Sequence, residues 1–186
     1  MLLFILGLII FFGAHFFTAF ARVARADVIT RLGPMRYRGL FSLVAFIGLA
    51  LIIVGWPDAD KTVLYVTPPA LRHVTYGLVL IAFILLAAAY LPAGKIAAAA
   101  KHPMLASVKI WAFAHLLVNG DVRSLLLFGS FLGFSVIDRI VLKRRGAPTP
   151  TAGPIKNDLI AVAVGVIAYG AVAFYLHQYI AGVALF

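Results

Sequence analysis

The distribution of apolar residues constrains this chain more than any other feature of its sequence. The 186 residues are 64% hydrophobic, well above the roughly 45–50% apolar content of an ordinary soluble domain. A chain of this length cannot bury such an excess in one core, whereas a membrane span needs about 20 mostly apolar residues. The sequence therefore predicts an all-α, polytopic helical membrane bundle.

Six apolar stretches are candidates for membrane spans. They are Leu2–Ala21, Leu40–Trp56, Val74–Leu91, Met104–Val118, Ser124–Leu142 and Leu159–Tyr179. The fourth stretch is short and contains Lys109, so a recessed or interfacial helix in its place would leave five spans. No connection between the stretches is long enough to fold by itself, and we expect one domain over residues 1–186.

The basic residues predict the orientation of the bundle. The net charge is +10, and most Lys and Arg residues lie in the connections after the first, third and fifth stretches. Because basic loops concentrate on the cytoplasmic side of a membrane, both termini are predicted to face outward. The same rule explains the charge without nucleic acid as a partner, and the lipid bilayer is the expected surrounding. The oligomeric state stays open.

Three connections have patterns of their own. Arg22–Arg38 mixes arginines with apolar residues and is predicted to be an amphipathic stretch on the inner leaflet, broken at Gly33 and Pro34. Pro57–His73 is expected to be an ordered outer loop, and Arg144–Asn157 a flexible linker. The first stretch has no basic residue before it, so a membrane span is favoured over a cleaved signal peptide.

Two pairs of small residues are spaced four apart within the predicted spans. Gly129 and Gly133 form the first pair, and Ala161 and Gly165 the second. Small residues allow helix backbones to approach closely in membranes. Both pairs are therefore expected to mark close contacts between helices of the chain.

Missing residue types exclude several kinds of chemistry. Cysteine and glutamate are absent, and the six acidic residues are aspartates in loops or near span ends. Thiolate metal sites and cysteine nucleophiles are therefore excluded. A carboxylate-rich di-iron centre and a proton pump with a buried carboxylate have no support either.

Histidine is the residue type that can bring chemistry into the spans. At about 1.5 Å per helical residue, His15 lies roughly 20 Å from the outer end of its stretch, and His115 roughly 18 Å from the inner end of its own. Ionisable residues at such depth are functional candidates, and neutral imidazole is a ligand for haem iron or copper. Five phenylalanines surround His15 in the sequence, while Trp111 precedes His115 by one turn and Asn119 follows it by one turn.

The histidines could also have purely structural roles. A histidine in a span can serve helix packing through a hydrogen bond to a neighbouring helix, without any ligand. His102 precedes Pro103 and is expected to cap the fourth helix, because proline suits the first helical position. His102 is nevertheless kept as a further candidate for cofactor binding.

Several motifs resemble the NnrU family. They are Gly13-Ala14-His15, His102-Pro103-Met104-Leu105, the run Ile110–Asp121 and the run Leu125–Gly129. The resemblance extends over nearly the whole chain and implies a multi-pass protein of the bacterial inner membrane that is associated with denitrification, in nitrite and nitric oxide reduction. The family includes the plant zeta-carotene isomerase, so the resemblance also implies b-type haem with His15 and His115 as axial ligands. The plant enzyme can use a cysteine near the second histidine, and this chain has none.

Two functions follow from these observations. The first is a membrane haem protein that performs redox chemistry or cis–trans isomerisation of an apolar polyene. The second is a non-enzymatic assembly or accessory factor for nitrogen-oxide respiration, which would bind a respiratory reductase component and no haem. A transporter is less favoured, because the sequence has no broken helix or buried charge pair that would mark a substrate path.

Overall fold

The computed structural model describes residues 1–185, whose regular structure is helical apart from an isolated bridge between Val63 and Asp121. Two compact units divide the chain: Met1–Val63 with Asp121–Ser130, and Leu64–Gly120 with Phe131–Phe186. The elements in chain order are α1 (Leu2–Phe20), α2 (Arg22–Leu32), α3 (Pro34–Gly55), α4 (Leu71–Tyr90), α5 (Lys95–Ala100), α6 (Pro103–Leu116), α7 (Val122–Arg144), α8 (Ile155–Ala171), the π-helical η1 (Val172–Leu176) and α9 (His177–Ala181).

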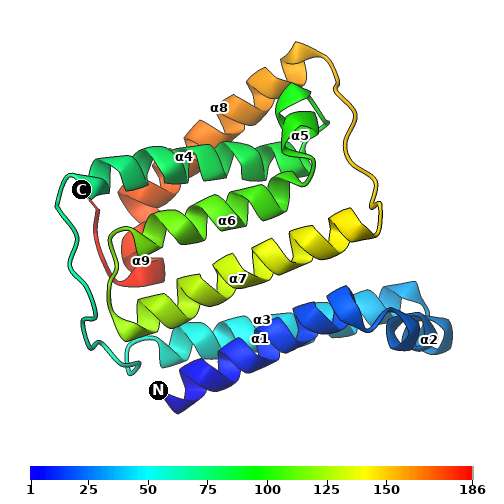
Figure 1. Ribbon diagram of the computed structural model, residues 1–186, viewed down its shortest axis with the longest axis horizontal. Coiled ribbons are helices and arrows are strands. Elements are labelled where there is room, and N and C mark those ends of the chain that lie inside the picture. Colours follow the sequence, from blue (N-terminus) through cyan, green and yellow to red (C-terminus); the bar gives the residue numbers. More distant parts are fainter. Residues whose placement is uncertain (186) are drawn as a thin grey trace. The chain divides into compact units, whose positions relative to one another are not determined.

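The first unit is built on α1 and α3, which lie side by side and antiparallel (Figure 1). Glycines let the two backbones come close to each other. A Cβ on Gly55 would lie 2.4 Å from the Phe4 amide nitrogen, and one on Gly7 would lie 2.6 Å from the Ile52 amide nitrogen. The contact therefore has no room for side chains at these glycines, as is common where helices pack in membranes.

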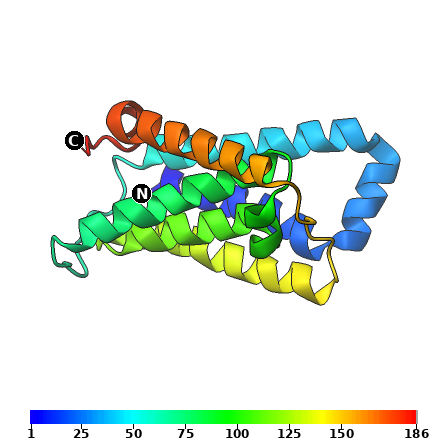
Figure 2. The same cartoon turned by 90° about the horizontal axis from the view of Figure 1, so that it is seen from above.

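Helix α2 connects α1 to α3 and lies across their ends (Figure 2). The predicted break is confirmed, because Gly33 has a φ of 81° and Pro34 is the first residue of α3. The predicted amphipathic character is wrong for α2, whose arginines and apolar residues are spread around the helix and none of whose residues is buried. The Arg25 guanidinium lies 5.5 Å from the centre of the Tyr37 ring, which links α2 to α3.

In the second unit, α4 packs against α6 and α8 (Figure 1). The hydroxyl of Thr75, near the start of α4, donates to the Ala114 carbonyl near the end of α6 at 3.0 Å. Farther along, the Ser107 hydroxyl donates to the Ala82 carbonyl at 2.7 Å. Helix α6 therefore runs antiparallel to α4 and returns the chain to the end of the unit at which α4 starts.

One of the two predicted small-residue contacts is confirmed. Ala161 is 2% exposed, and a Cβ on Gly165 would lie 2.6 Å from the Ile84 Cα, so α8 approaches α4 closely there. The prediction for Gly129 and Gly133 is wrong, since a Cβ on either would meet no atom within 4 Å among the described residues. A spacing of four places two small residues on one face, but a contact also needs a helix opposite that face.

Five helical segments are long and apolar enough to cross a membrane: Leu2–Phe20, Pro34–Gly55, Leu71–Tyr90, Val122–Arg144 and Ile155–Ala181. The chain is thus a multi-pass membrane protein. The fourth predicted span forms α6, which has 14 residues and is about 21 Å long, shorter than the roughly 30 Å hydrocarbon layer. By length and composition, five segments of residues 1–185 therefore qualify as membrane spans, and α6 does not.

Asp158 joins the start of α8 to the first residues of α5. Asp158 is 6% exposed, and its carboxylate accepts the backbone N–H groups of Lys95 and Ile96, both at 2.9 Å. The first N–H groups of a helix have no partner within the helix, so this carboxylate satisfies two of them. The Asn157 amide adds a 2.8 Å bond to the Ala93 carbonyl. The connection predicted to be a flexible linker thus ends in specific contacts.

We expect Asp158→Ala to destabilise the second unit. The backbone N–H groups of Lys95 and Ile96 would lose a charged acceptor. Hydrogen bonds to charged groups contribute about 1.5–3 kcal/mol each, so the thermal unfolding temperature in detergent should fall by several degrees. Asp27→Ala is the control, because Asp27 forms an exposed ion pair with Arg31 worth roughly 1 kcal/mol or less. Equal shifts in the two variants would contradict the role assigned to Asp158.

Candidate cofactor site

His15 lies in α1 of the first unit and is held by Phe11, one turn earlier. His15 Nδ1 donates to the Phe11 carbonyl oxygen at 2.7 Å. The imidazole stacks on the Phe11 ring with centroids 4.3 Å apart, and the Phe41 ring of α3 meets it edge-on at 5.3 Å. Because a carbonyl can only accept, Nδ1 carries the hydrogen, and Nε2 of the neutral ring carries the lone pair.

His115 lies at the end of α6 in the second unit and has the same local arrangement. Its Nδ1 donates to the Trp111 carbonyl oxygen at 2.8 Å. The rings of Trp111 and His115 have centroids 5.0 Å apart, and Phe131 meets the Trp111 indole edge-on at 5.4 Å. Here too the lone pair of the neutral imidazole lies on Nε2.

The shared arrangement follows from helix geometry. In a helix, residues four apart lie on one face, and a carbonyl oxygen has two lone pairs. The oxygen that accepts the backbone N–H of the histidine can therefore also accept its Nδ1–H. An aromatic residue four positions before each histidine, Phe11 or Trp111, adds a flat apolar neighbour to the imidazole. His15 and His115 belong to different units, and each is described within its own unit.

The end of α6 is fixed by contacts that the sequence did not predict. The helix ends at Leu116 rather than Val118, so Asn119 lies beyond it, and the Asn119 side-chain amide donates to the His115 carbonyl at 2.8 Å. The Tyr65 hydroxyl donates to the Leu116 carbonyl, and the Leu64 and Tyr65 amides both donate to the Gly120 carbonyl. Tyr65, in the connection predicted to be an ordered outer loop, thus holds the turn that follows His115.

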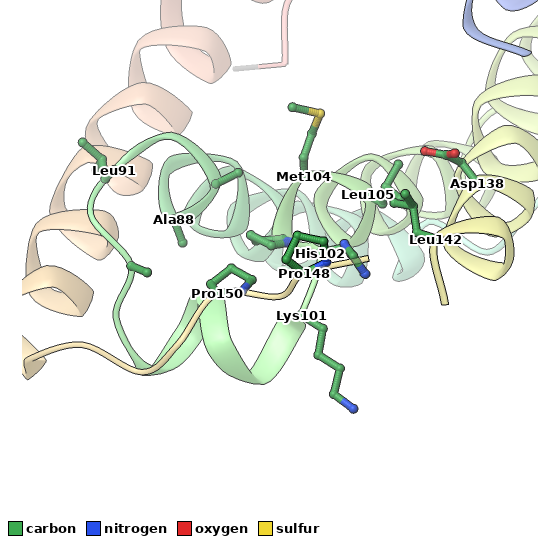
Figure 3. Close-up of a pocket in the computed structure, with 13 residues that line it drawn as sticks. Ala88, Leu91, Lys101, His102, Met104, Leu105, Asp138, Leu142, Pro148 and Pro150 are labelled. Atoms are coloured by element: carbon green, nitrogen blue, oxygen red, sulfur yellow. The ribbon is translucent and has the colours of Figure 1, made fainter. Parts of the chain in front are cut away.

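His102 lies at the opposite end of α6 from His115. It occupies the N-cap position before Pro103, as predicted, but its side chain makes no capping hydrogen bond. The side chain lines a cavity of about 390 Å³ together with Lys101 and Asp138 (Figure 3). Burial, followed by the positive charge of Arg139, lowers the pKa of His102 below 6.5, while Asp138 acts in the other direction. His102 therefore does not share a site with His115.

A smaller pocket of about 180 Å³ lies beside Trp111. Phe83 and Leu86 of α4 and Val108 of α6 give it mainly apolar walls, and Ser107 directs its hydroxyl to the Ala82 carbonyl. The indole that contacts His115 therefore also borders a space suited to an apolar group. Within residues 1–185, no three His or Asp side chains gather to hold a metal ion together.

The family comparison decides the identity of this membrane protein. The family model described as NnrU protein matches residues 3–185. The chain belongs to the NnrU family. Neither a curated protein nor a solved structure matches it. In this NnrU protein, one motif that resembles the family, Gly13-Ala14-His15, lies in α1. The others run from the N-cap of α6 through the turn held by Tyr65 into α7.

The lowered pKa of His102 predicts a pH effect on the stability of this NnrU protein. The folded chain binds the imidazole proton less readily than the unfolded chain does, so acidification destabilises the fold. The loss begins as the pH falls through the unfolded value near 6.5 and is complete below the folded pKa. Thermal unfolding at about pH 7.5 and about pH 5 should show a smaller decrease for His102→Gln than for the wild type. An identical decrease in both proteins would show that His102 does not contribute.

Proposed function

We propose that this NnrU protein is a haem protein of the bacterial inner membrane, with His15 and His115 as the axial ligands of a b-type haem. The observation that carries the proposal is the hydrogen bond from each Nδ1 to the carbonyl one turn earlier. Histidines that bind metals almost always donate their second ring N–H to a carbonyl or carboxylate, which fixes the ring and the tautomer. Both histidines have this support.

The surroundings of the two imidazoles fit a haem. Phe11 and Phe41 lie against His15, and Trp111 lies against His115 with Phe131 behind it. A porphyrin has an apolar face, so aromatic walls suit it better than charged groups. Two neutral imidazoles form a donor set that haem iron accepts. The donors present are therefore compatible with the proposed group.

The residues of the chain would orient and shield the bound group. Haem would supply one-electron chemistry, with a potential set by the axial ligands and their hydrogen bonds. The resemblance to the family links such chemistry to denitrification, in nitrite or nitric oxide reduction. The apolar pocket beside Trp111 supports a second activity, isomerisation of an apolar polyene, because it can bind a hydrocarbon segment near His115.

We further propose six membrane passes with both termini outside, in which α6 is the fourth along the chain and the shortest. In the second unit, α6 is short but still runs antiparallel along α4 and so returns the chain to the end at which α4 starts. Lys95 and Lys101 lie at the end where α4 finishes, and Arg144 ends α7 beside the cavity residue Leu142 of the same unit. Loops rich in Lys and Arg are retained in the cytoplasm, which supports a cytoplasmic location for the end of the unit that carries these basic residues.

Absorption spectra test the haem proposal. Detergent-purified wild type should show a Soret band, with sharp α and β bands after reduction by dithionite. His15→Ala and His115→Ala should each lose the haem or convert it to a five-coordinate form, because one axial nitrogen is removed. His73→Ala, at the start of α4, is the matched control and should leave the spectrum unchanged.

Two results would contradict the proposal. Protein that takes up no haem on reconstitution, although it is folded, would favour an assembly or accessory factor in which the histidines serve packing. Spectra that are identical in the wild type and both histidine variants would place the ligands elsewhere. If the wild type binds haem and only His115→Ala loses it, His15 would be excluded as a ligand and His115 would remain one.

Reporter fusions test the proposed topology. Alkaline phosphatase is active outside the inner membrane, whereas green fluorescent protein matures inside. With six passes, phosphatase fused at either terminus should be active, and a fluorescent protein in the connection between α7 and α8 should fluoresce, because basic residues concentrate there. Termini on opposite sides would show that α6 does not cross the membrane.

A further inference from the structure

Lys101, between α5 and α6, has an unusual backbone conformation. Its φ is 62°, and among residues 1–185 no other residue except glycine has a positive φ. The His102 amide donates to the Ala100 carbonyl at 2.7 Å, which closes a three-residue turn around Lys101. Such a γ-turn with positive φ is strained for a residue that has a side chain. Glycine would adopt it at lower cost, so a specific role for the Lys101 side chain is indicated.

The strained turn borders the cavity of about 390 Å³ (Figure 3). This volume lies in the range of about 300–1,000 Å³ that is typical of ligand sites. The walls are mainly apolar and come from the end of α4, the start of α6, the end of α7 and the loop before α8; they include Ala88, Leu91, Leu105, Leu142 and Pro150. Small alanines on one side leave room for a hydrocarbon chain.

The charges around the cavity are mostly positive. Lys101 lines it, and Arg139 follows the lining residue Asp138. The segment between the lining residues Leu142 and Pro148 contains a further three cations, Lys143, Arg144 and Arg145. Asp138 is the single carboxylate among the lining residues. The field at this end of the unit therefore favours an anion.

We propose that this cavity binds an anionic phospholipid, with the Lys101 ammonium at the phosphate and the apolar walls along the first part of an acyl chain. Basic pockets between helices on the cytoplasmic side of a membrane are suited to anionic head groups. The apolar walls favour a lipid over a soluble phosphate, which would leave them exposed to water. The proposal requires a membrane protein but does not depend on haem.

Lipid binding to the full-length chain tests the proposal. Native mass spectrometry of detergent-purified protein, titrated with phosphatidylglycerol or phosphatidylcholine, compares an anionic with a zwitterionic head group. Wild type should bind phosphatidylglycerol more tightly, and Lys101→Gly should weaken this binding roughly fivefold, as expected for the loss of one cation near the head group. Lys61→Gly removes an exposed lysine of the first unit and should bind as the wild type does.

Thermal unfolding separates recognition from folding. Lys101→Gly relieves the backbone strain, so its unfolding temperature should be unchanged or higher while phosphatidylglycerol binding is weakened. A lower unfolding temperature together with weaker binding would give Lys101 a structural role and overturn the proposal. Equal affinity for the two lipids, or unchanged binding in Lys101→Gly, would overturn it as well. Displacement of phosphatidylglycerol by millimolar inorganic phosphate would identify a site for a soluble anion instead.

Discussion

The proposed function depends on the hydrogen bond between a histidine Nδ1 and the carbonyl one turn earlier. In apolar surroundings a polar group without a partner is costly, and His15 and His115 both use the backbone of their own helix to avoid that cost. The bond also fixes the orientation of each imidazole, so that Nε2, which carries the lone pair, is the ring nitrogen that can coordinate a metal. The hydrogen bond that satisfies each histidine within its own helix thus also gives the ring the orientation and tautomer that a metal-binding histidine needs.

The remaining structure holds these two helices in place. Glycines bring α1 and α3 into backbone contact, and α6 is joined to α4 by the hydroxyls of Thr75 and Ser107. The turn after His115 is closed by Tyr65, and Asp158 secures the other end of the same unit. Because hydrophobic association is weak between helices in lipid, such close packing and polar bonds carry the specificity of the fold.

Sequence reasoning located most spans, because a continuous apolar run is a direct physical requirement of the bilayer. It overestimated the length of α6, which ends at Leu116, where the hydroxyl of Tyr65, some 50 residues away in the chain, donates to the last carbonyl of the helix. It assigned close packing to Gly129 and Gly133 and missed Gly7 and Gly55, because the backbone that faces a glycine from a neighbouring helix is a tertiary property. The histidines were recognisable by residue type and depth, whereas the Lys101 turn and its cavity are evident only in the three-dimensional structure.

The tautomers of His15 and His115 test the central claim most directly. Nitrogen-15 spectra of histidine-labelled protein without haem, assigned with the single His15→Ala and His115→Ala variants, report which ring nitrogen carries the hydrogen. The structure predicts Nδ1–H for both residues at a pH at which the rings are neutral, and loss of both sets of signals to paramagnetic broadening when ferric haem is added. Nε2–H tautomers, or signals that haem leaves unchanged, would contradict the account.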